Sequence, residues 1–150
     1  MKQRTMFKKS AFTMTLTLAL ALVLAIPAFA ASYPVQFLGS DGVTPSTHAS
    51  SYIEGGAADV TGSAGNYTVT LKLKNYEPSF PALPISYPSL KVDLNGDGTY
   101  ETTANRSVSG SNTVFTFSGV NNLSDNVPVL LAVNVSGIHS TEYDLYIDWL

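Results

Sequence analysis

The sequence predicts an all-β domain, and three observations support this class. Apolar residues recur with a period of two, turn-forming residues separate the alternating stretches, and no long stretch has the helical period. About seven short strands with regular turn signals are typical of a β-sandwich or barrel. The strands that we expect, in chain order, are residues 34–38, 57–61, 67–74, 90–94, 114–119, 127–135 and 143–149.

The alternation is clearest in two of these strands. Residues 67–74 alternate between apolar and polar side chains, as a half-buried strand does. Residues 143–149 do the same at the end of the chain. Residues 127–135 are almost continuously apolar, which predicts a central strand covered on both faces. Clusters of Gly, Ser and Asn mark turns at residues 62–66, 95–98 and 109–112.

Two segments between the strands have a different character. Residues 47–52 follow a loop rich in Gly, Pro and Ser and are expected to form the domain's one short helical turn. Residues 77–88 contain four prolines. Because proline has no N–H for the ladder of a central strand, we expect this segment to be a loop at the rim of the domain.

Residues 1–30 are expected to be a secretory signal peptide, leaving residues 31–150 as the mature domain. A basic start precedes an apolar run, and Ala28 and Ala30 occupy the small-residue positions of a cleavage site. The run is shorter than the roughly 20 residues of a membrane span. Four of the eight Lys and Arg residues and none of the eleven Asp and Glu residues lie in this segment, so the mature domain has a net charge of −7. This charge argues against nucleic acid or an anionic membrane as a partner.

The sequence contains no cysteine. Thiolate metal sites, cysteine nucleophiles and a lipoprotein anchor are therefore excluded. The domain must be stable through its core alone, and about 120 residues can bury a sufficient core. The form of the signal and the lack of cysteine indicate a Gram-positive bacterial source. With no sortase motif and no second hydrophobic segment, we expect the mature protein to be secreted and extracellular.

Asp93, Asn95 and Asp97, with Gly98 directly after them, are similar to the start of an EF-hand calcium loop. The twelfth position of such a loop supplies a bidentate Glu, but here it is Ala104, and the flanking residues favour strands. Asn and Asp beside Gly are also typical of a tight hairpin. We favour the hairpin, and a weak calcium site stays open as the alternative.

No catalytic set stands out in the sequence. There is no nucleophile-elbow motif. Asp144 and Asp148 fall on the face of their strand opposite Tyr143, which indicates a solvated face and not a pair of catalytic carboxylates. We therefore expect that the protein is not an enzyme.

The most informative residues are two His-x-x-x-Tyr pairs, His48 with Tyr52 and His139 with Tyr143. Residues four apart on a strand share a face, so His139 and Tyr143 can point the same way at the mouth of an apolar face. A His at a hairpin turn beside a packed Tyr would have the same spacing. From the residues alone, this structural interpretation is favoured over a ligand site.

Four segments in order resemble the NEAT (near iron transporter) domain, the haem-binding module of Gram-positive iron-regulated surface proteins and secreted haemophores. Residues 33–37 are similar to its first strand, and residues 47–52 to its lip helix with the pattern Ser-x-x-x-x-Tyr. Residues 65–75 are similar to the strand that begins with Tyr and ends near Asn, and residues 137–147 to the final hairpin with Tyr-x-x-x-Tyr. The resemblance implies an immunoglobulin-like β-sandwich of about eight strands with one short lip helix. Haem would lie between that helix and the last hairpin.

The resemblance also implies roles for five residues. His139 stands where the family has its axial Tyr, and Tyr143 matches the second Tyr. Thr47 replaces the Ser that bonds a haem propionate, Tyr52 matches the Tyr that packs on the porphyrin, and His48 could reach the distal face of the iron. Imidazole is a common haem ligand, so His139 could hold the iron itself. Alternatively, the domain has lost tyrosinate ligation and binds haem weakly, or binds another ligand.

The function implied by the resemblance is that of a secreted, haemophore-like protein that binds haem without a covalent bond for iron acquisition. Haem is then the ligand, and a haem donor such as haemoglobin or a cell-wall NEAT receptor is the candidate protein partner. The alternative is a non-haem extracellular binding or adhesion module of the same β-sandwich class.

Overall fold

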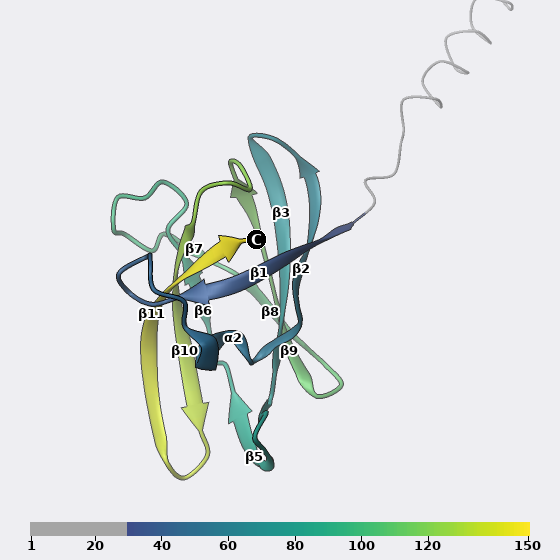
Figure 1. Cartoon of the computed structure of the whole chain (residues 1–150), viewed down its shortest axis with the longest axis vertical. Coiled ribbons are helices and arrows are strands. Elements are labelled where there is room, and N and C mark those ends of the chain that lie inside the picture. Colours follow the sequence, from purple (N-terminus) through teal and green to yellow (C-terminus); the bar gives the residue numbers. More distant parts are fainter. Residues whose placement is uncertain (1–29) are drawn as a thin grey trace, which may run out of the picture.

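The computed structural model describes residues 30–150. The expected signal, residues 1–30, lies outside the described residues except for Ala30. Within residues 30–150, no helix is long and apolar enough to cross a membrane. Figure 1 shows the helix and the strands of this part of the chain. Their bounds are β1 (Ala31–Leu38), α2 (Thr47–Ser50), β2 (Ile53–Ser63), β3 (Asn66–Lys74), β4 (Tyr76–Glu77), β5 (Phe80–Ser86), β6 (Leu90–Val92), β7 (Thr102–Thr103), β8 (Asn105–Ser109), β9 (Asn112–Val120), β10 (Val127–Val135) and β11 (His139–Trp149).

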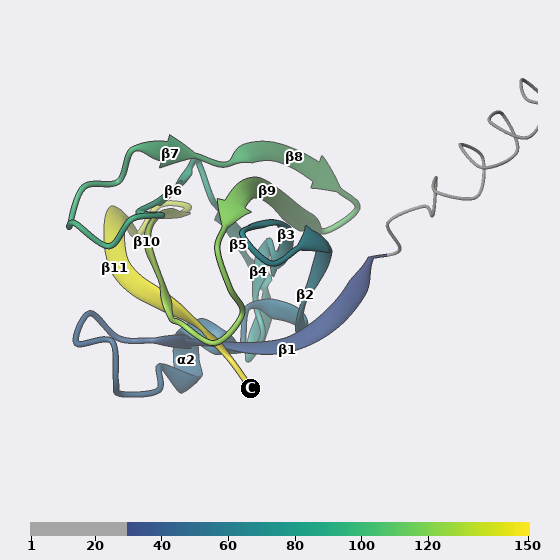
Figure 2. The ribbon, with the colours of Figure 1, turned by 90° about the horizontal axis from the view of Figure 1, so that it is seen from above.

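The strands form one hydrogen-bonded path in the order β4-β5-β10-β11-β1-β2-β3-β9-β8. Off this path, β6 pairs with β10 and β7 pairs with β6. The pairs along the path are antiparallel. The sheet curls so that its two halves face each other (Figure 2), which confirms the expected β-sandwich class. Strand β1 belongs to both halves, because its residues up to Pro34 pair with β2 and those from Val35 onward pair with β11.

The core lies between the two halves and follows the period of two. On β3, Val69, Leu71 and Leu73 are fully buried, and on the neighbouring β9 Phe115 and Phe117 point to the same interior. Burying each of these side chains stabilises the fold by about 1.5–3 kcal/mol relative to leaving it exposed. The alternation predicted for residues 67–74 is therefore confirmed.

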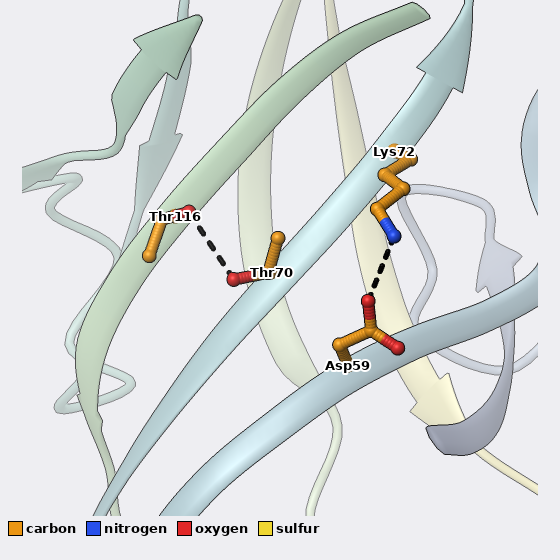
Figure 3. Close-up of polar contacts among 4 residues, drawn as sticks. All are labelled: Asp59, Thr70, Lys72 and Thr116. Carbon is orange, nitrogen blue, oxygen red and sulfur yellow. Dashed lines mark hydrogen bonds and ion pairs between the residues drawn. The ribbon is translucent and has the colours of Figure 1, made fainter. Parts of the chain in front are cut away.

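The outer face of the same strands is polar. Figure 3 shows two side-chain pairs that join neighbouring strands on this face. The hydroxyl oxygens of Thr70 on β3 and Thr116 on β9 lie 3.2 Å apart. The ammonium of Lys72 lies 2.8 Å from a carboxylate oxygen of Asp59 on β2. Both charged side chains are about two-fifths exposed, so their ion pair adds little stability. The outer face is therefore polar, and most of the stability of the sheet comes from the core.

Residues 127–135 were expected to form a strand covered on both faces. The strand is confirmed, but the covering of both faces is wrong. Strand β10 has those bounds and is central, pairing with β11, β6 and β5. Only alternate residues are buried, however, and Asn134 is exposed. The outward residues Leu130 and Ala132 pair with Asp144 and Glu142 of β11. A two-layer sandwich has one inner face for each sheet, so a continuous apolar run need not be covered twice.

The proline-rich segment is also more ordered than expected. Residues 77–88 were expected to form a rim loop, but most of them belong to the β4–β5 hairpin. Pro81 and Pro84 lie in β5, and both are exposed. This strand pairs with β10 only at Ile85 and Ser86, so its prolines remove few ladder hydrogen bonds.

Two strands carry no alternating signal and were not expected. Strand β8 is exposed along its whole length and is held at the edge of the sheet by pairing with β9. Strand β7 has two residues and pairs with β6. Backbone pairing with a neighbour, and not the burial of a face, places both strands. The expected helical turn is present as α2, which ends two residues earlier than the expected Tyr52.

Candidate functional site

One apolar pocket of about 300 Å³ opens between the lip helix α2, the β10–β11 hairpin and the β5 edge, and its floor is made by core strands. These elements lie toward one end of the sandwich in Figure 1. The volume is at the lower end of the range typical for ligand sites. The lining residues are Phe37, Ser46, His48, Ala49, Tyr52, Leu73, Glu77, Leu83, Ile85, Tyr87, Leu131, Val133, Val135, Ile138, His139, Tyr143 and Leu145.

Contacts with β1 hold the lip helix in place. Helix α2 has four residues and is too short to be stable by itself. The N–H of Ser46 donates to the carbonyl of Phe37 at 2.8 Å. The N–H of Phe37 donates in turn to the hydroxyl of Ser50 at 2.8 Å, and that hydroxyl donates to the carbonyl of Ser46 at 2.8 Å. The end of β1 therefore fixes the lip over the pocket.

The lip presents His48 and Tyr52 as an edge-to-face pair of rings. Their ring centroids lie 5.3 Å apart in an edge-to-face arrangement, and Nε2 of His48 lies 3.4 Å from the hydroxyl of Tyr52. The same hydroxyl donates a hydrogen bond to the carboxylate of Glu77 on β4. Burial, followed by the hydrogen bond to Glu77, raises the pKa of Tyr52 well above its usual range. The hydrogen bond from Tyr52 in turn lowers the pKa of Glu77, with a second contribution from Ser79.

Tyr87 supports this wall from inside the fold. Its side chain is almost fully buried, and its hydroxyl donates to the carbonyl of Lys74 at 3.0 Å. Burial raises the pKa of Tyr87 well above the ordinary range. Its ring packs edge-on to that of Tyr52, with centroids 6.5 Å apart. Tyr52 is thus held between a surface imidazole and a buried phenol.

The β10–β11 hairpin brings His139 and Tyr143 to the same pocket. His139 is the first residue of β11 and pairs with Val135, while Tyr143 pairs with Leu131. The hydroxyl of Tyr143 lies 3.3 Å from Nε2 of His139. Tyr143 is 43% exposed, and the turn residue Ile138 beside this pair is 64% exposed. The pocket therefore has a His–Tyr pair on each of two walls and an exposed apolar edge.

Two solved structures share this arrangement of strands. The NEAT5 domain of IsdX2, a B. anthracis hemophore, in complex with heme matches with a TM-score of 0.63 over 82% of this chain and 96% of that chain, at 16% sequence identity. A mutant of the same domain, also in complex with heme, matches with the same TM-score and identity over 83% of this chain and 97% of that one. The domain has the NEAT fold. No protein-family model matches the chain, and no curated protein sequence matches it.

Four of the five residues singled out from the sequence meet at this pocket of the NEAT fold. His48, Tyr52, His139 and Tyr143 all line it. Thr47 is exposed at the start of α2 and is not among the lining residues, although the preceding Ser46 is. If a hydroxyl of the lip meets a ligand inside the pocket, Ser46 is the better placed of the two.

Sequence reasoning missed Glu77 and Tyr87 as residues of the site. Glu77 follows Tyr52 by 25 residues, and no motif connects the two. The only signal was the proline-rich stretch, which was expected at the rim and does contribute Glu77 there. Tyr87 follows the β4–β5 hairpin and had no alternating neighbours to indicate its burial.

The loop from Asp93 to Glu101 lies apart from this pocket and connects β6 to β7, which pair as a hairpin. The flanking strands therefore pair as expected, but they are joined by a long loop and not by a tight turn. Asp93 is almost fully buried, and its two carboxylate oxygens accept hydrogen bonds from the N–H groups of Gly96 and Gly98 at 2.7 and 2.8 Å. Carboxylate oxygens of Asp93, Asp97 and Glu101 lie within 4.8 Å of one another. A weak calcium site in this loop stays open as the alternative.

Proposed function

We propose that the mature protein is a secreted, haemophore-like protein that binds haem without a covalent bond, with His139 as the iron ligand. The observation that carries this proposal is the apolar pocket with a His–Tyr pair on each of two walls. Two solved structures of the same fold are complexes with heme, which also supports the proposal. The four lining residues that were singled out from the sequence would form the haem contacts, with Thr47 at the outer rim.

The walls of the pocket suit a porphyrin. Most of its lining residues are aliphatic or aromatic, and strands β10 and β5 supply a continuous apolar surface. Burying a large flat apolar ring against such a surface is favourable by about 25 cal/mol for each Å² removed from water. No Lys or Arg of residues 30–150 lines the pocket, so the acidic edge of a haem has no cation to meet inside it. We infer that this edge faces solvent, near the hydroxyls of Ser46 and Thr47.

The donor atoms suit iron. Imidazole nitrogen is a common axial ligand of haem, and a bound haem would supply the iron for uptake as cargo. Nε2 of His139 is the nitrogen that faces the hydroxyl of Tyr143. Ligation through Nε2 would therefore displace this contact, which assigns Tyr143 the role of orienting the imidazole before haem arrives. A direct Tyr143 ligand with His139 as its proton acceptor is the competing arrangement.

The experiment that tests the proposal is a hemin titration of the purified mature protein, followed by the Soret band. We expect saturable binding at one haem for each chain. His139→Ala should abolish most of this binding. His48→Ala is the matched control, because it removes the same side chain from the opposite wall, and we expect it to keep most of the affinity. A wild-type protein that shows no Soret shift would overturn the haem proposal and favour the adhesion or binding-module alternative.

Haem uptake from a donor protein is the second part of the proposal. Mixing the mature protein with ferric haemoglobin and separating the two should leave haem on the smaller protein. The same experiment with His139→Ala should leave the haem on the donor. Binding of free hemin without any transfer from haemoglobin would limit the protein to free haem or to another donor, such as a cell-wall NEAT receptor.

A further inference from the structure

The two His–Tyr pairs of the pocket have the same spacing but differ in where the tyrosine proton goes. On the lip, the hydroxyl of Tyr52 donates to the carboxylate of Glu77 and also contacts Nε2 of His48. On the hairpin, the hydroxyl of Tyr143 has one hydrogen-bond partner among residues 30–150, which is Nε2 of His139. Glu77 is thus the difference between the two walls.

A tyrosine hydroxyl has one proton to donate, and an ionised carboxylate can only accept. Glu77 is held as an acceptor by three donors, because its second oxygen accepts from the N–H of Ser79 at 3.2 Å and from the hydroxyl of Ser79 at 2.7 Å. These contacts lower the pKa of Glu77 and keep it ionised at neutral pH. The proton of Tyr52 is therefore committed to Glu77.

The remaining contact favours one tautomer of His48. Since the proton of Tyr52 points at Glu77, its oxygen faces His48 with lone pairs only. Nε2 of His48 at 3.4 Å makes a favourable contact only when it carries a hydrogen and donates. A metal ligand must be an unprotonated nitrogen. Nε2 of His139 is under no such constraint, because Tyr143 can donate to it.

We propose that Glu77 is a positioning residue that keeps Nε2 of His48 protonated, so that this nitrogen cannot ligate iron while Nε2 of His139 can. This inference rests on the proposed haem binding for its consequence at iron, but not for its effect on His48. It assigns a role to the β4–β5 hairpin, which holds Glu77 against the lip.

The first test uses the protein without haem. Glu77→Leu replaces the carboxylate acceptor with an apolar side chain of similar size, so the Tyr52 proton becomes free to point at His48. In ¹⁵N-histidine NMR spectra near pH 8.5, about two units above the ordinary imidazole pKa, we expect protonated Nε2 of His48 in the wild type. In Glu77→Leu the resonance should move toward the unprotonated range. Glu77→Gln keeps a carbonyl oxygen as acceptor and should resemble the wild type.

Glu54→Leu is the matched control, because Glu54 is an exposed carboxylate of β2 that does not line the pocket. It should leave the His48 resonances unchanged. Tyr52→Phe provides a second route, since it removes the hydroxyl itself and should also release Nε2 of His48. Unprotonated Nε2 in the wild type, or a His48 tautomer that does not respond to Glu77→Leu, would overturn the inference.

The second test adds hemin and reads the iron by visible and electron paramagnetic resonance spectra. We expect a five-coordinate, high-spin ferric state in the wild type and in Glu77→Gln. Glu77→Leu should show a six-coordinate, low-spin fraction that disappears in Glu77→Leu/His48→Ala. A six-coordinate wild type whose spectrum depends on His48 would overturn the inference while leaving haem binding intact. Absence of haem binding in all variants would overturn the proposed function and the consequence at iron. The NMR test without haem would then decide whether Glu77 controls the tautomer of His48.

Discussion

The hydroxyl of Tyr143 lies 3.3 Å from Nε2 of His139, four residues earlier on the same strand. Four residues of an ideal strand span about 13 Å, so the two side chains must lean toward each other to make this contact. Both line the apolar pocket under the lip. The pair therefore offers one nitrogen and one oxygen at the same point of the pocket wall, and the proposed function assigns iron ligation to the nitrogen of His139.

Substituting each member of this pair should separate ligand from support. Loss of a residue that only supports a metal ligand typically costs about 10–100-fold in affinity. We expect Tyr143→Phe to weaken hemin binding by about 10-fold and His139→Ala by more than about 100-fold, as measured by hemin titration. If His139→Ala keeps its affinity and Soret spectrum while Tyr143→Phe loses binding, Tyr143 is the ligand.

The Asp93 loop should be stable without calcium. Both carboxylate oxygens of Asp93 are already satisfied by the N–H groups of Gly96 and Gly98, and the closing Glu of a calcium loop is replaced by Ala104. Chelation with EDTA should therefore change neither the melting temperature nor hemin binding. A melting temperature that rises with added calcium would show that the loop binds the ion.

Asp93 itself should matter for folding. Asp93→Ala leaves two N–H groups without their charged acceptor, and we expect a loss of about 2–4 kcal/mol in the free energy of unfolding. Urea denaturation measures this loss. The control is Asp97→Ala, an exposed neighbour in the same loop, which should cost much less stability than Asp93→Ala. Equal effects of the two substitutions would contradict a structural role specific to Asp93.

Asp41 should make stability depend on acid pH. The hydroxyl of Thr44, together with the N–H groups of Thr44 and Val43, lowers the pKa of Asp41 from 3.8 to about 2. Because the folded-state pKa is depressed, its contribution is present above pH 3.8 and is lost as the pH falls toward 2. The stability difference between wild type and Asp41→Ala should therefore shrink over this range. Thr44→Val should raise the pKa of Asp41, as read by carboxyl NMR titration, and an unchanged pKa would contradict this assignment.

The exported protein should begin at Ala31. Ala28 and Ala30 occupy the small-residue positions that a signal peptidase requires. The intact mass of protein recovered from the medium tests the cleavage point, and Ala30→Asp should block processing. Recovery of exported protein that retains residues 1–30 would contradict the prediction.

Much of the fold could be predicted from the sequence, since burying one face of a strand leaves an alternating pattern. Residues 67–74 and 143–149 carried that pattern, and they belong to β3 and β11. The pattern was silent for β8, which is exposed on both faces and held by backbone pairing with β9 and by the hydrogen bond from Arg106 to the carbonyl of Tyr87. It misled for β10, where the apolar character of the outer face does not mean that a second layer covers it.

The sequence by itself determined the strand class, the spacing of the two His–Tyr pairs and the absence of thiol chemistry, because these depend on residues that are near one another in the chain or on composition. Only the tertiary structure decided that His48 and His139 share one pocket, and that the proton of Tyr52 goes to Glu77. The curl of the sheet brings the lip to the last hairpin. The β4–β5 hairpin places the carboxylate of Glu77 against Tyr52, which precedes it by 25 residues. Hydrogen bonds between such distant segments depend on the packing of the whole sandwich, which no local pattern records.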